Sequence, residues 1–124
     1  MPHERRLFGT SGEEVAATFL QRQGMKLLFR QKRTRIGEID LVCLDGETIV
    51  FVEVKTRHTP NFGPPQAAIT RAKFRHMAGA AQAFLAEQNW LSRPWRLDVA
   101  AVDWPPGKEP CIVHFPAIDG PASF

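Results

Sequence analysis

The chain has 124 residues, enough for one domain with a single core. Its composition, 44% hydrophobic and 23% charged residues, is typical of a folded globular protein. We therefore expect flexibility only at residues 1–10 and 117–124. Sixteen basic against thirteen acidic residues give a formal net charge of +3 and a pI near 9.2, a mild bias towards polyanionic partners. No apolar run is long enough to cross a bilayer and no secretory leader is recognisable, so we expect no membrane association and a cytoplasmic location.

The first predicted element is a helix over residues 12–23. Ser11 and Glu14 have the spacing of a capping box, and Gly24 is a typical helix stop. Glu13 lies near the edge of the apolar stripe and has no capping role. It is either an acid that interacts favourably with the helix dipole or a functional carboxylate.

A short apolar run at residues 25–29 predicts the first strand. Residues 30–35 follow with four cations, among them Arg33 and Arg35. Cations grouped in this way can hold the phosphates of a nucleic acid. The alternative is a solvated strand and turn.

Residues 37–55 are two β-rich runs around Asp45-Gly46, a dipeptide that strongly favours a hairpin because it tolerates positive φ. Loops of two or four residues around it give the same register. The cross-strand pairs are then Leu44 with Glu47, Asp40 with Phe51, and Glu38 with Glu53.

Alternation of side chains divides the hairpin into two faces. The core face is predicted to hold Ile39, Leu41, Val50, Val52 and Val54, and the other face to hold Glu38, Asp40, Phe51, Glu53 and Lys55. Buried carboxylates are costly unless they are paired or bind a metal, and Mg²⁺ prefers oxygen ligands. The alternative is an ordinary solvated face. We expect a half-buried face with a charged mouth, because apolar residues occupy the same face nearer the turn.

The remaining predicted elements are a loop over residues 56–65, a helix over 66–88, a connector over 89–94 and strands over 96–102 and 111–115. Lys73 is either a phosphate contact or part of the solvated side of its helix. Asp98, inside a strand, is either structural or supports a site. Cys43 and Cys111 have no metal-type spacing and are interpreted as small apolar residues. The scattered histidines give no support to a zinc site or a histidine-based triad.

The element order α-β-β-β-α-β-β predicts an α/β fold with a mixed sheet flanked by helices. On this sheet Asp40 is followed, after twelve residues, by Glu53-x-Lys55. The pattern suits metal-dependent hydrolysis of phosphodiesters. Asp40 and Glu53 would hold Mg²⁺, while Lys55 would orient the attacking water or help to deprotonate it, and would stabilise charge near the phosphate.

Six segments resemble the YraN-type family of small bacterial proteins. They are Gly9-x-x-x-Glu13-x-x-Ala16, Gly37-Glu38-Ile39-Asp40-Leu41-Val42, Phe51-Val52-Glu53-Val54-Lys55-Thr56-Arg57, Phe62-Gly63, Ile69-Thr70-Arg71-Ala72-Lys73 and Arg96-Leu97-Asp98-Val99. That family is similar in turn to restriction-endonuclease-like nucleases, especially archaeal Holliday-junction resolvases. The resemblance implies a restriction-endonuclease-like core in a single domain over residues 1–124.

By position, the resemblance makes Glu13 the helix acid of the catalytic site, Asp40 and Glu53 the metal ligands, and Lys55 the catalytic lysine. Glu38 is an auxiliary ligand or a residue that supports the ligands. The implied cofactor is Mg²⁺ or Mn²⁺, and the implied partner is DNA, including branched DNA, bound by a homodimer. The expected backbone contacts are Arg33, Arg35, Arg57 and Lys73.

Two other classes of function stay open. The first is a nucleic-acid-binding accessory protein that keeps the nuclease fold and does not cut. The second is a protein-interaction module whose acidic face contacts a basic partner. Metal-dependent turnover and salt-sensitive binding separate these alternatives.

Overall fold

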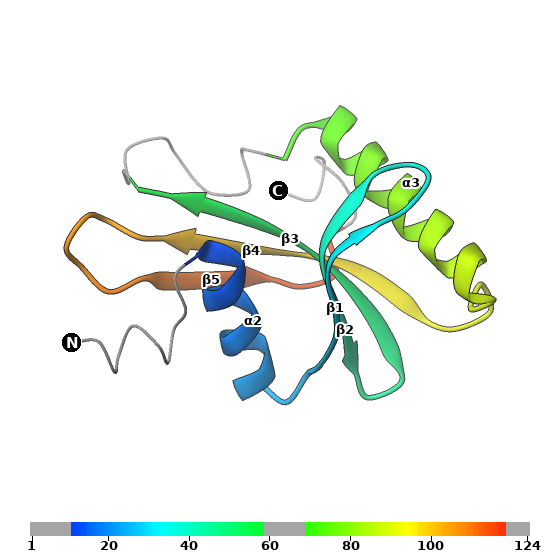
Figure 1. Ribbon diagram of the computed structural model, residues 1–124, viewed down its shortest axis with the longest axis horizontal. Coiled ribbons are helices and arrows are strands. Elements are labelled where there is room, and N and C mark those ends of the chain that lie inside the picture. Colours follow the sequence, from blue (N-terminus) through cyan, green and yellow to red (C-terminus); the bar gives the residue numbers. More distant parts are fainter. Residues whose placement is uncertain (1–10, 59–68, 119–124) are drawn as a thin grey trace.

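The computed structural model describes residues 11–58 and 69–118, in two helices and five strands (Figure 1). The order α-β-β-β-α-β-β is as predicted. The elements are α2 (Gly12–Arg22), β1 (Lys26–Arg33), β2 (Glu38–Asp45), β3 (Thr48–Arg57), α3 (Arg71–Gln88), β4 (Trp95–Asp103) and β5 (Cys111–Phe115). Expectations for residues 1–10, 59–68 and 119–124 lie outside the described residues. Neither of the two described helices is long and apolar enough to span a membrane.

The strands form one mixed sheet in the order β1-β2-β3-β4-β5. Neighbouring strands are antiparallel except β3 and β4, which are parallel and are connected through α3. A parallel pair needs a crossover of this kind, and the helix covers one face of the sheet. The α/β class and the mixed sheet are confirmed.

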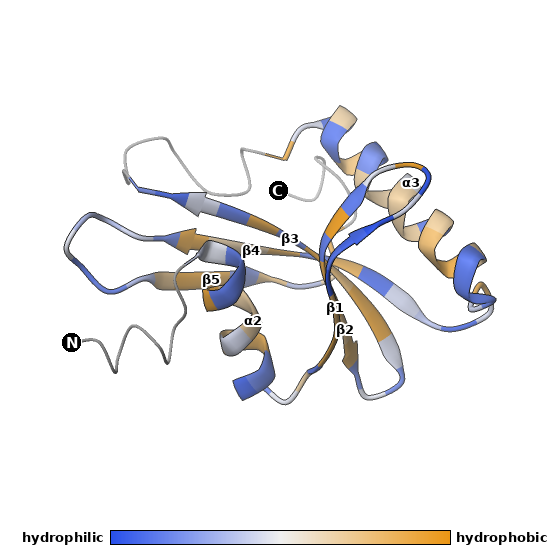
Figure 2. Cartoon of the chain, viewed as in Figure 1, coloured by the Kyte–Doolittle hydropathy of each residue, from blue (hydrophilic) through white to orange (hydrophobic). Residues whose placement is uncertain are grey.

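The two helices pack on opposite faces of the sheet, each over its own core cluster. Below α3 lie Val42, Ile49, Phe51, Leu97 and Val99, and below α2 lie Leu41, Cys43, Val50, Val52, Ala100 and Val102. Both faces of the central strands are therefore buried, which explains their nearly continuous apolar sequence (Figure 2).

The first helix is close to the prediction, and the second begins later than predicted. Both hydrogen bonds of the Ser11–Glu14 capping box are present, at 3.0 and 3.2 Å. The helix over 66–88 was placed too early, since Ile69 and Thr70 are not helical. Thr70 is the N-cap of α3, and its hydroxyl accepts a hydrogen bond from the Lys73 N–H at 3.1 Å.

The hairpin between β2 and β3 exists, but its predicted register is wrong by two residues. Asp45 pairs with Thr48 and Leu41 with Val52, so the loop is Gly46-Glu47. The φ of Gly46 is +61°, a conformation that suits glycine. Because the error is an even number, the paired residues keep their predicted faces. The register, continued beyond Leu41, brings Asp40 to the level of Glu53 instead of Phe51.

Ile39 is on the opposite face from the one predicted, because it packs in the cluster below α3. The first strand is also longer than predicted: β1 continues through Arg33, so residues 30–33 belong to an edge strand. Cys43 is buried, and burial raises the pKa of its thiol to about 12. Cys111 is exposed on β5, the other edge strand, and both cysteines are free thiols.

Asp98 is fully buried and joins four parts of the fold. Its carboxylate accepts hydrogen bonds from Arg96 Nε at 3.0 Å and the Ala117 N–H at 2.9 Å, and it lies 2.7 Å from His114 Nε2. Arg96 also donates to Asp45 at the hairpin end. Burial opposes ionisation of Asp98, but its hydrogen-bond donors outweigh burial and lower its pKa. Asp98 is structural, which decides the question that the sequence left open.

Replacement of Asp98 by alanine should destabilise the protein by about 3 kcal/mol, because buried donors lose their acceptor. The free energy of unfolding from urea titration at pH 7 measures this loss. Glu47→Ala, a change at the exposed hairpin loop, is the control and should stay within about 0.5 kcal/mol of the parent. Equal stability of the two variants would contradict the structural role of Asp98.

Candidate active site

The site lies where β2 and β3 separate. Their ladder ends at the pair Leu41–Val52, and beyond it the two strands diverge (Figure 1). The Asp40 side chain fills the opening, and its Oδ2 accepts a hydrogen bond from the Val54 N–H at 2.8 Å. The carboxylate therefore satisfies a backbone donor that the ladder no longer pairs.

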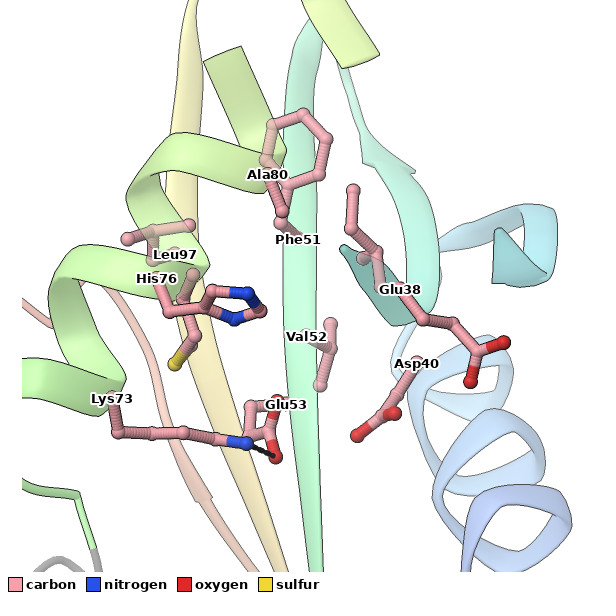
Figure 3. Close-up of a pocket in the computed structure, with 11 residues that line it drawn as sticks. Glu38, Asp40, Phe51, Val52, Glu53, Lys73, His76, Ala80 and Leu97 are labelled. Carbon is pink, nitrogen blue, oxygen red and sulfur yellow. Dashed lines mark ion pairs between the residues drawn. The ribbon is translucent and has the colours of Figure 1, made fainter. Parts of the chain in front are cut away.

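A cavity of about 230 Å³ opens beside Asp40, between the sheet and α3 (Figure 3). Its carboxylates are on the strands, Glu38 and Asp40 on β2 and Glu53 on β3, whereas Lys73 and His76 are on α3. The remaining lining is mainly apolar and comprises Ile39, Phe51, Val52, Met77, Ala80 and Leu97. The half-buried face with a charged mouth is what the sequence predicted for this hairpin.

Glu53 is more enclosed than Glu38, with 12% of its side chain exposed against 43%. Its Oε2 lies 3.1 Å from Lys73 Nζ and 3.8 Å from Lys55 Nζ. Two lysines from different elements therefore balance one carboxylate.

Asp40 has an unusual protonation equilibrium. Burial is the main cause that raises its pKa from 3.8 to about 6. The Val54 N–H and Lys73 lower it, and the negative charges of Glu53 and Glu13 raise it further. An acid with a displaced pKa, in a pocket with other charged groups, is typical of a functional site.

Glu13, in the first turn of α2, is close enough to Asp40 for its negative charge to raise the pKa of that carboxyl. Its Oε1 is buried without a hydrogen-bond partner among the described residues. The helix comes close to β3 because residue 12 is glycine, and a Cβ there would overlap the Thr56 hydroxyl. A buried oxygen left unsatisfied costs free energy, so a ligand that binds it would be favoured.

The donor set suits a hard divalent cation. Within residues 11–58 and 69–118, no three His, Cys, Asp or Glu side chains are as close together as the ligands of one ion. Mg²⁺, however, is commonly held by one or two carboxylates and completes its shell with water and substrate phosphate. Asp40 and Glu53, with the unsatisfied oxygen of Glu13 nearby, fit that requirement.

The structure adds His76, which the sequence analysis did not select. It lies one helical turn after Lys73 on the same side of α3, and its ring rests against Gly37. A Cβ at position 37 would lie 2.5 Å from the His76 ring. The spacing of Lys73 and His76 was visible in the sequence, but only the fold brings it opposite the carboxylates.

The other predicted basic residues have different surroundings. Arg33 has a largely exposed side chain, 3.9 Å from Glu38, and Arg35 is exposed in the turn after β1. Arg57 is held by Asp103 through two hydrogen bonds, at 2.7 and 3.0 Å, which raise the pKa of its guanidinium. Only Lys73 of this group lines the pocket.

The raised pKa of Asp40 predicts a pH-dependent stability. Its folded-state pKa is above the ordinary 3.8, so its favourable contribution is complete below pH 4 and is lost as the pH rises through about 6. Asp40→Asn should remove this loss, about 1–2 kcal/mol after allowance for solvent screening. Urea titrations in EDTA between pH 4 and 7.5 measure it. The control Glu47→Gln should lose stability with rising pH as the parent does. If Asp40→Asn also loses stability in this way, the burial of Asp40 does not cause the pH dependence.

Comparisons with known proteins place the chain in a family. A family model described as "Uncharacterised protein family UPF0102" matches residues 12–102. A UPF0102 protein of Geobacter metallireducens is 47% identical over 108 residues, which cover 87% of this chain and 88% of the relative. A UPF0102 protein of Syntrophotalea carbinolica is 43% identical over 97% of this chain and 99% of its own length.

A UPF0102 protein of Nocardia farcinica is 41% identical over 115 residues, which cover 93% of this chain and 91% of the relative. The match therefore includes α2, both strands of the acidic hairpin, α3 and most of β4. These are the elements that supply every residue of the pocket. The chain belongs to the UPF0102 family, the YraN-type family that its motifs resemble.

Proposed function

We propose that this protein is a Mg²⁺-dependent endonuclease that hydrolyses phosphodiester bonds of DNA in the cytoplasm. The observation that carries the proposal is the grouping of Asp40 and Glu53 at the separation of β2 and β3. Glu13, which has an unsatisfied buried oxygen, acts electrostatically on Asp40. Basic side chains adjoin these acids. Acids that hold a cation next to groups that hold phosphate are the parts that phosphodiester hydrolysis requires.

Each acid and lysine of the hairpin motif, together with Glu13, has a distinct task in this proposal. Asp40 and Glu53 would hold Mg²⁺ or Mn²⁺, and Glu38 at the mouth would support them. The cation supplies a Lewis acid that lowers the pKa of a bound water. Lys55, 3.8 Å from Glu53, would orient the attacking water and stabilise the negative charge that develops on the phosphate. Glu13 would position the acids from the α2 side.

The DNA backbone would follow the basic surface beside the pocket. Arg33 and Arg35 are exposed next to Glu38 at the end of β1 and in the turn after it. Arg57 would contribute positive potential, although its guanidinium is held by Asp103. The resemblance to resolvases favours a branched DNA substrate and a homodimer that brings two sites to two strands.

The test is a cleavage assay with labelled single-stranded, duplex, flap and four-way-junction DNA in Mg²⁺ or Mn²⁺. We expect the parent to cut at least one substrate, and Asp40→Ala and Glu53→Ala to lose at least about a hundredfold in rate, as expected when a cation loses a ligand. Glu47→Gln, an acid of the same hairpin outside the pocket, should cut like the parent. Cleavage that survives in Asp40→Ala would refute the site assignment.

A specific observation also favours the accessory-protein alternative. Lys73 Nζ lies 3.1 Å from Glu53 Oε2, so part of the negative charge of the pocket is balanced without a metal ion. A protein of this kind would bind DNA without turnover. Its log affinity should fall by about 0.9 per log unit of salt for each phosphate neutralised. Binding measured by fluorescence anisotropy between 50 and 300 mM salt, with no cleavage in any metal, would replace the endonuclease proposal by this one.

A further inference from the structure

The positive charge of the pocket comes mainly from α3 and not from the hairpin. Lys73 and His76 line the cavity from this helix, one turn apart, opposite the carboxylates of β2 and β3 (Figure 3). Lys55, the lysine of the hairpin motif, does not line the cavity, and its Nζ is farther from Glu53 than that of Lys73 is.

Lys73 forms an ion pair with Glu53 Oε2, an oxygen that a bound cation would need. Its Nζ is 3.1 Å from Glu53 Oε2, and it also lowers the pKa of the neighbouring Asp40. A divalent cation on Glu53 would repel the ammonium group at such a distance. The Lys73 side chain is 35% exposed and has a flexible four-carbon stem, so its ammonium group can move from Glu53 to another partner.

His76 is the second basic residue of α3 that lines the pocket. Its ring is exposed at the mouth and rests against Gly37, the one residue type that leaves space for it there. No hydrogen bond or ion pair to its ring nitrogens is present within the described part of the chain. The titratable groups that line the pocket with it are Glu38, Asp40, Glu53 and Lys73.

We propose that Lys73 and His76 form a phosphate-binding pair, in which Lys73 leaves Glu53 for a phosphate oxygen when a phosphodiester enters the pocket and His76 donates a second hydrogen bond to it. The inference deepens the proposed function, since it rests on a phosphodiester as substrate. It assigns a role to His76 and makes Lys73 a charge that changes partner. An ammonium group and a ring N–H are both donors to phosphate oxygens.

The test follows the imidazole of His76 directly. The ¹³Cε1–¹Hε1 NMR signal of His76, identified by its absence in His76→Asn, is recorded while the dinucleotide d(TpT) is added in EDTA and in Ca²⁺. We expect the signal to move in both conditions, at lower dinucleotide concentration in Ca²⁺ because the cation releases Lys73. The signal of His114, which is bound to Asp98 away from the pocket, should not move.

Variants separate the pair from general electrostatics. Lys73→Gln should raise the dinucleotide concentration needed by about tenfold, the effect of one lost charge-assisted hydrogen bond. Arg75→Gln removes the same charge from an exposed position of α3 that does not line the pocket, and it should behave like the parent. Gly37→Ala places a methyl group against the His76 ring and should displace it. The shift of the His76 signal on addition of d(TpT) should then be smaller, although His76 itself is unchanged.

An unmoved His76 signal in the parent, or an equal response in Lys73→Gln and Arg75→Gln, would overturn the inference. An unchanged His114 signal in each variant confirms that the variant is folded. If His76 responds but no DNA is cleaved, the endonuclease proposal fails and the phosphate pair stands. If cleavage depends on Asp40 but His76 does not respond and Lys73→Gln cuts like the parent, the phosphate pair fails alone.

Discussion

The hydrogen bond from the Val54 N–H to the Asp40 carboxylate is the interaction on which the site depends. It replaces a backbone bond at the place where β2 leaves β3, so the sheet opens without an unsatisfied donor. Glu13, on α2, acts electrostatically on Asp40, and the cavity lies beside Asp40 between the sheet and α3. Asp40 is therefore influenced by groups from α2, from β3 and from α3.

Two buried acidic groups of the sheet are balanced differently. Asp98 is fully satisfied by Arg96, His114 and a backbone N–H, and it is readily ionised. The acids of the pocket instead share two lysines, and Asp40 is protonated more readily than an ordinary aspartate. The hydrogen bonds of Asp98 hold the strands together. The incomplete pairing of the pocket acids costs free energy, which a ligand that binds them would recover.

Local signals predicted much of this structure, and long-range contacts account for what they missed. The capping box at Ser11 and the Asp45-Gly46 turn are formed by neighbours in the chain, so the sequence shows them directly. Alternation of side chains predicts only the face that each residue takes. It does not determine which residues pair across the hairpin, and the predicted register was wrong by two residues. The reversal of Ile39 and the approach of His76 to Gly37 depend on packing against α3, which no local pattern contains.

The basic edge strand has a consequence for the protein's behaviour in concentrated solution. Among the strands of residues 11–58 and 69–118, β1 pairs only with β2, and its outer backbone groups offer a template to a strand of another molecule. Arg30, Lys32 and Arg33 lie along that edge, and like charges on an incoming copy would repel it. The positive charge of β1 therefore protects this edge against pairing with a second copy of the chain.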